Sequence, residues 1–136
     1  MEKEPWIIVV THGFFGKELL NSAKMILGEI KNAYGFALEH SMSPEELYAS
    51  IAEEVKDAPE KSVIFVDLFG GTPSNVALKL SKERNFQLIS GVSLPMLIEF
   101  EMSRLQKDHS YAVEKCMDAA KSGVRDVVQE FENKEK

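Results

Sequence analysis

The sequence predicts a three-layer α/β/α sandwich built on a mainly parallel sheet. Short apolar runs alternate along the chain with longer segments whose apolar residues recur at helical spacing. Continuous apolar runs such as residues 6–10 and 62–66 are typical of strands that a parallel sheet buries on both faces. Strands and helices that alternate in this way favour a sheet covered by helices.

Four strands are predicted, over residues 6–10, 34–39, 62–66 and 86–89. The last apolar segment is ambiguous. Val124, Val127, Val128 and Phe131 have helical spacing, but their β-branched content also allows a strand.

Five helices are predicted between and after these strands. Ser43, Pro44 and Glu46 form a capping-box pattern, which predicts a helix starting at residue 44. Thr72 is expected to cap the following helix, and Gly123 to end the last one. The other predicted ranges are 16–29, 73–83, 93–104 and 109–121.

Composition and charge exclude several classes of protein. The 136 residues, 44% apolar and 28% charged, predict one domain over residues 1–136, with residues 130–136 as a charged tail. No apolar run approaches the ~20 residues of a membrane span, and no signal peptide is evident, so a cytoplasmic location is expected. The net charge of −6 with scattered basic residues argues against nucleic-acid binding. A single cysteine, Cys116, excludes an internal disulfide and a multi-cysteine metal site.

Two chemically active residues follow predicted strands. His12 comes directly after the first strand, and Asp67 ends the third. Because ligands bind beyond the carboxyl ends of parallel strands, both side chains are expected at one edge of the sheet. A carboxylate that accepts from one ring nitrogen leaves the other nitrogen with a free lone pair. Since no serine or cysteine nucleophile is evident beside them, the imidazole is the predicted attacking group.

Residues 70–75, here called the anion-binding turn, predict what that nucleophile attacks. Gly70 and Gly71 allow backbone amides to approach an anion, and the helix after them directs free N–H groups to the same place. Thr72 and Ser74 add hydroxyl donors. The spacing does not fit a P-loop, which disfavours nucleotide hydrolysis. The turn suits a phosphoryl group held on a neighbouring histidine.

Each feature also has a simpler interpretation. A histidine after a strand is usually an ordinary residue, an aspartate there can form a turn, and Gly-Gly-Thr-Pro can be a tight turn with a helix cap. Their combination at one sheet edge favours a site. His40 is interpreted as a loop residue, and a metal site of His12, His40 and Asp67 lacks ligand spacing. Phe14 and Phe15 either flank the site or pack in the core.

Three stretches together show a resemblance to a known family: residues 7–13 (IIVVTHG), 66–75 (VDLFGGTPSN) and 91–97 (GVSLPML). With them the chain resembles the IIA component of the mannose family of the phosphoenolpyruvate-dependent sugar phosphotransferase system. The resemblance implies a parallel four-stranded sheet with a fifth, antiparallel strand contributed by the other subunit of a homodimer. It thus implies a swapped strand near residues 124–128.

The resemblance also implies a function without a cofactor. His12 would accept a phosphoryl group on Nε2 from the phosphocarrier protein HPr and pass it to a IIB component. That component serves sugar uptake through membrane-embedded permease partners. Asp67 would bond the other ring nitrogen, and Thr72 would lie by the phosphoryl oxygens. No IIB domain follows in this chain, so it resembles a stand-alone IIA protein.

Two alternatives stay open. One is a phosphotransfer subunit for dihydroxyacetone kinase, although the resemblance to that branch does not extend over residues 70–75. The other is a non-catalytic domain that binds an anion or a partner through the same turn. The pairing of His12 with Asp67, which mere binding does not need, favours chemistry.

Overall fold

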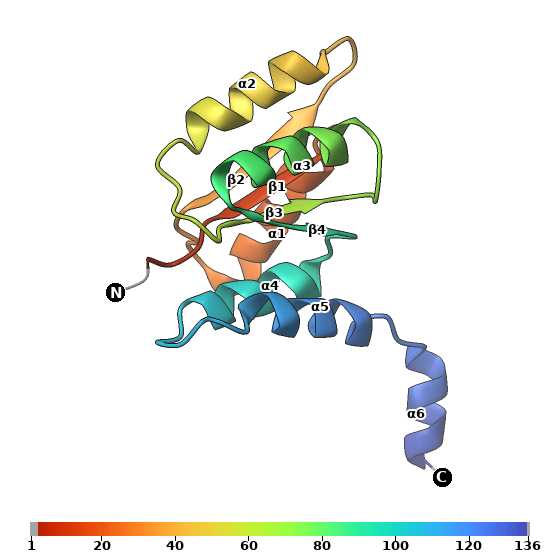
Figure 1. Ribbon diagram of the computed structural model, residues 1–136. Helices are drawn as coiled ribbons and strands as arrows, with labels where there is room; N and C mark the ends of the chain where they lie inside the picture. Colours follow the sequence, from red (N-terminus) through yellow and green to blue (C-terminus); the bar gives the residue numbers. More distant parts are fainter. Residues whose placement is uncertain (1–2, 136) are drawn as a thin grey trace.

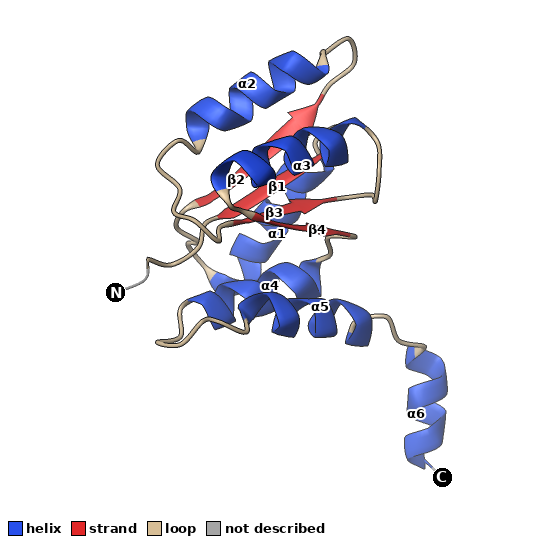
Figure 2. Ribbon diagram, in the orientation of Figure 1, coloured by secondary structure: helices blue, strands red, loops and turns tan. Residues whose placement is uncertain are grey.

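The computed structural model describes residues 3–135 and contains a parallel four-stranded sheet (Figures 1 and 2). The strands lie in the order β2-β1-β3-β4. Every neighbouring pair is parallel, so the predicted parallel sheet is confirmed. The strands are β1 (Ile7–His12), β2 (Ala33–Leu38), β3 (Val63–Val66) and β4 (Gln87–Ser90).

Helices cover both faces of the sheet and give the predicted three layers (Figure 1). One face carries α1, α4 and α5, and the other carries α2 and α3. The helices are α1 (Phe15–Leu27), α2 (Pro44–Glu54), α3 (Thr72–Arg84), α4 (Leu94–Arg104), α5 (Ala112–Ser122) and α6 (Val127–Glu135). No helix within residues 3–135 combines the length and apolar character needed to cross a bilayer.

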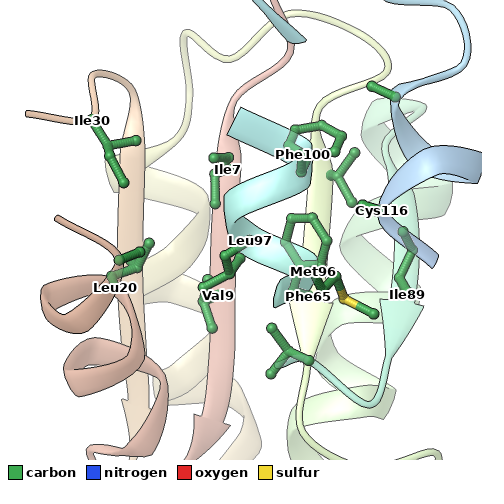
Figure 3. Close-up of a cluster of buried hydrophobic side chains, with 14 residues drawn as sticks. Ile7, Val9, Leu20, Ile30, Phe65, Ile89, Met96, Leu97, Phe100 and Cys116 are labelled. Carbon is green, nitrogen blue, oxygen red and sulfur yellow. The ribbon is translucent and has the colours of Figure 1, made fainter. Parts of the chain in front are cut away.

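The central strand β1 supplies both cores, because successive side chains of a strand point to opposite faces. Ile7 and Val9 are fully buried against α1 and α4, and Ile8 and Val10 are fully buried against α2 and α3. Figure 3 shows the first of these clusters. There Phe65 of β3 packs edge-on against a ring of α4, Phe100, with centroids 5.3 Å apart. Burial on both faces explains the unbroken apolar runs of the sequence.

The helix starts follow from short-range signals, with two corrections. Ser43 and Glu46 form the predicted capping box of α2. The prediction that Thr72 caps α3 is wrong: Gly71 occupies the N-cap with φ of +89°, and Thr72 is already helical. Helix α5 begins at Ala112 rather than at 109. Before it, Asp108 accepts hydrogen bonds from the amide and hydroxyl of Ser110, and this local turn competes with the helix.

The ambiguous C-terminal segment is helical from Val127 onward, and the expected swapped strand at 124–128 is not formed in this single chain. A strand needs a neighbour to satisfy its backbone N–H and C=O groups, whereas a helix satisfies them internally. Helix α6 extends away from the sheet (Figure 1). Val124, Val127, Val128 and Phe131 are all more than half exposed. The last residue of the predicted tail, residue 136, lies outside the described residues.

At the amino ends of the strands, Arg104 is almost fully buried. Its guanidinium donates to the carbonyl of Pro5 at 2.9 Å, to that of Lys31, and to the carboxylate of Glu101 at 2.6 Å. Arg104 therefore links α4 to the segments that lead into β1 and β2, at the opposite edge from His12.

Candidate functional site

His12 and Asp67 meet at the carboxyl edge of the sheet. His12 is the last residue of β1, and Asp67 follows the end of β3, the strand paired with β1. His12 Nδ1 lies 2.9 Å from Asp67 Oδ2, and the same oxygen accepts the backbone N–H of His12 at 3.0 Å. The carboxylate therefore holds both the ring and the backbone of the histidine.

Asp67 is itself held in place and ionised. Its Oδ1 accepts the backbone N–H of Leu68 at 3.0 Å. Partial burial opposes ionisation, but the hydrogen bonds from the ring and backbone of His12 outweigh it and hold the pKa of Asp67 below its usual value. An ionised carboxylate only accepts hydrogen bonds, so Nδ1 of His12 carries the proton. In the neutral ring, Nε2 then keeps its lone pair, on a side chain that is 49% exposed.

The anion-binding turn approaches this outer nitrogen through Gly71. A Cβ added there would lie 3.6 Å from His12 Cε1 and 3.8 Å from Nε2. Gly70 and Gly71 have φ of +91° and +89°, conformations that glycine adopts without steric cost. The two glycines thus bring the backbone of the turn to the ring.

Helix α3 begins at this point with amides that its own hydrogen bonds leave free. The first bond within the helix runs from the Asn75 amide to the Gly71 carbonyl, at 2.9 Å. Pro73 has no N–H, so Thr72 and Ser74 present the amides of the first turn, at the positive end of the helix dipole. An anion at the start of α3 could therefore accept hydrogen bonds from these two amides and would lie at the positive end of the dipole.

Other residues of the turn line a neighbouring cavity. Gly70 and Ser74 help to line an apolar cavity of about 600 Å³ between α3, β4 and α5, together with Leu78, Leu88 and Met117. Among the predicted phosphoryl-binding residues, Gly71 is the one that the structure places next to the His12 ring.

Exposed apolar side chains follow both site residues along the chain. Phe14 and Phe15 are 55% and 51% exposed, so they do not pack in the core. Leu68 and Phe69, which follow Asp67, are 60% and 94% exposed. The sequence places this second pair within the family-resembling stretch 66–75 but does not predict that the two side chains are exposed.

His40 also lies at this edge, where it lines a cavity of about 710 Å³ with His12, Phe14 and Glu39. Among residues 3–135, however, no three histidine, cysteine or acidic side chains are grouped so as to hold a metal ion. The metal-site alternative therefore gains no support.

Comparison with known proteins places the chain in a family. The family model described as "PTS system fructose IIA component" matches residues 6–117. The chain is 35% identical over 101 residues to the mannose-specific EIIAB component of the phosphotransferase system (PTS) of Escherichia coli K12. That match covers 72% of this chain and 31% of the relative, so the chain spans about a third of that protein's length.

Two further relatives agree. The chain is 34% identical over 96 residues to the PTS fructose-specific EIIA component of Bacillus subtilis, covering 68% of this chain and 66% of that protein. The crystal structure of phosphotransferase system component EIIA from Streptococcus agalactiae is similar with a TM-score of 0.83 and 30% identity, covering 91% of this chain and 98% of that one. The chain belongs to the mannose–fructose family of PTS IIA components.

Proposed function

We propose that this chain is a phosphoryl carrier in which Nε2 of His12 accepts a phosphoryl group from phospho-HPr and passes it to a IIB component for sugar uptake. The observation that carries the proposal is the 2.9 Å contact between His12 Nδ1 and Asp67, which leaves Nε2 as the free nucleophile beside Gly71.

The transfer follows from this geometry. The lone pair of His12 Nε2 attacks the phosphorus of the donor's phosphohistidine, the donor's P–N bond breaks, and its electron pair returns to the donor's nitrogen. The Nδ1 proton stays on the ring, where Asp67 offsets the positive charge that develops. The second transfer, to the IIB component, repeats these steps with His12 as the leaving group.

The anion-binding turn supplies the electrostatic part of the proposed reaction. The amides of Gly71, Thr72 and Ser74 and the start of α3 would stabilise the phosphoryl oxygens, with Gly70 shaping the turn. Phosphoryl transfer needs positioning and charge stabilisation more than other covalent chemistry, and fixed amides provide both.

The exposed apolar residues support a protein as the exchange partner. A phosphoryl group on His12 must reach the nucleophile of another protein, so the surface around the ring has to form a contact. Phe14 and Phe15, which follow His12 along the chain, and Leu68 and Phe69, which follow Asp67, provide exposed apolar area for such a contact. We propose that HPr and the IIB component bind here in turn.

Radiolabelled phosphoenolpyruvate with enzyme I and HPr tests the proposal. Label is expected on the wild-type chain in an acid-labile, base-stable form, and none on His12→Ala. His40→Ala is the matched control, because it removes an exposed imidazole from the same sheet edge and should accept label normally. Label retained by His12→Ala, or none on the wild type, would contradict the assignment. If glycerone phosphorylation by a dihydroxyacetone kinase core required this chain, the alternative subunit role would take its place.

We further propose that the protein is a homodimer in which residues 124–131 of one copy cover the β4 edge of the other. Within the described residues β4 has a paired neighbour on one side, and the apolar cavity of about 600 Å³ lies beside it. The exposed valines and phenylalanine of the C-terminal segment are an apolar face that such an edge would bury.

Sedimentation equilibrium tests this assembly. Wild type is expected to be a dimer, and the double variant Val128→Glu with Phe131→Glu a folded monomer. A control double variant, Glu132→Gln with Gln129→Glu, changes exposed polar residues of the same helix and should remain a dimer. A monomeric wild type would refute the assembly without bearing on the chemistry of His12.

A further inference from the structure

A buried hydroxyl lies one residue before His12. Thr11 is fully buried, and its Oγ1 accepts the backbone N–H of Gly16 at 2.8 Å. The same hydroxyl donates to the carbonyl of Gly13 at 3.3 Å. Thr11 therefore touches the loop after His12 at two points, one at Gly13 and one at the start of α1.

Helix α1 depends on this hydroxyl for its start. Its N-cap residue, Phe14, makes no side-chain capping bond, and Gly16 is the second helical residue. The amide of such a residue has no partner within its own helix. Thr11, reaching from the preceding strand, takes the place of the missing cap and ties α1 to the end of β1.

The fit between α1 and β1 at this point is close. A Cβ added at Gly16 would lie 2.8 Å from Val9 Cγ1 and 3.0 Å from Thr11 Oγ1. On the other side of the loop, the amide of Gly13 donates to the carbonyl of Leu38 in β2 at 2.8 Å. The backbone that carries His12 is thus fixed immediately after it by Thr11 and β2, while Asp67 fixes it at its own amide.

We infer that Thr11 is a positioning residue for phosphoryl transfer, an inference that rests on the proposed function of His12. Its side chain points to the face opposite that of His12 because neighbouring strand residues alternate, so it acts through the backbone of the loop. By closing that loop, it holds the ring where Nδ1 meets Asp67 and Nε2 faces Gly71. Misplacing reacting groups by ~1 Å can slow a reaction ~100-fold, so a loosened loop is costly.

Two substitutions at Thr11 separate the hydroxyl from the rest of the side chain. Thr11→Val keeps the shape and removes both hydrogen bonds, whereas Thr11→Ser keeps the hydroxyl. Ser62→Ala is the matched control. Ser62 is also fully buried and accepts a backbone N–H, that of Trp6 at 2.9 Å, but at the amino end of the sheet, away from His12.

Two measurements are made on each variant after its fold has been checked. The first is the rate of label transfer from saturating phospho-HPr. The second is the ¹⁵N chemical shift of the His12 ring, which reports whether Nδ1 carries the proton and needs no donor protein. We expect Thr11→Val to transfer about 10–100-fold more slowly and to lose the preference for the Nδ1 proton. Thr11→Ser and Ser62→Ala should resemble wild type in both.

The outcomes are distinct. Wild-type rate and ring shifts in Thr11→Val would overturn the inference, as would equal slowing by Ser62→Ala. If the wild type accepts no label, the proposed function fails, and the ring shifts alone decide whether Thr11 positions His12. Should Thr11→Val not fold, Thr11→Cys replaces it, because sulfur is a weak hydrogen-bond acceptor. Thr11→Cys must then show both effects in smaller degree, and unchanged behaviour there overturns the inference.

Discussion

Replacing Gly71 by alanine adds one methyl group beside the nitrogen that we propose to be phosphorylated. The added carbon would lie 3.8 Å from His12 Nε2 and 3.6 Å from Cε1, which is ordinary van der Waals contact. The unmodified ring therefore need not move. A phosphoryl group on Nε2 has to occupy the space next to that methyl, so the substitution acts on the phosphorylated state.

The expected effects on stability and transfer differ in size. A side chain at φ of +89° strains the backbone by about 1–3 kcal/mol, so the free energy of unfolding should fall by that amount. Displacing the phosphoryl group from the amides of the turn by ~1 Å should slow transfer by ~100-fold.

Gly28→Ala is the control for strain. Gly28, at the end of α1, has φ of +84°, and a Cβ there would meet nothing within 4 Å. Urea unfolding should show similar losses of stability for the two variants, and label transfer from phospho-HPr should be slow in Gly71→Ala alone. Rapid transfer by Gly71→Ala would refute the placement of the phosphoryl group beside Gly71.

Four further predictions concern Asp67, Arg104 and Cys116. Asp67→Asn should keep the fold but slow transfer by roughly 10²–10⁴-fold, because an amide can also donate to Nδ1 and so permits the wrong tautomer of His12; an unchanged rate would remove the orienting role. The pKa of Asp67 is lowered from 3.8 in the folded chain, so its ionised carboxylate adds to the free energy of unfolding. This contribution should be fully present above about pH 4, and it should be lost as the pH falls through the lower pKa of the folded state. Urea unfolding of wild type and Asp67→Asn between pH 3 and 7 checks this sign, and a difference that grows on acidification would contradict it. Arg104→Met should lower the free energy of unfolding by about 3–5 kcal/mol, since it leaves Glu101 buried without its partner, and adding Glu101→Leu should recover part of the loss. Burial raises the pKa of Cys116 to about 12, so its thiol should resist Ellman's reagent at pH 8 until the chain unfolds.

The sequence predicted the sheet well because its signals are local. The strands β1 and β3 contain continuous apolar runs that burial on both faces explains, and the capping box of Ser43 is complete within four residues. The start of α3 was placed one residue off its cap, because the choice between Gly71 and Thr72 depends on a positive φ that composition does not reveal.

The site was predicted in part. The rule that strand ends meet at one edge brought His12 and Asp67 together, and the 2.9 Å distance between their side chains agrees with it. The rule says nothing of which side chains around them remain uncovered. The sequence therefore predicted neither the exposure of Phe69 nor the hydrogen bond between Thr11 and the amide of Gly16.

By itself, the sequence determined which segments are strands and which two side chains meet at their carboxyl edge, because periodicity and strand ends are properties of neighbouring residues. Only the tertiary structure decided that the turn approaches the His12 ring at Gly71, that α1 takes its cap from β1, and that the C-terminal segment is helical in the single chain. The first two features depend on contacts between segments far apart along the chain. The third depends on the absence of a neighbouring strand among residues 3–135. A pattern of neighbouring residues in the sequence reveals neither.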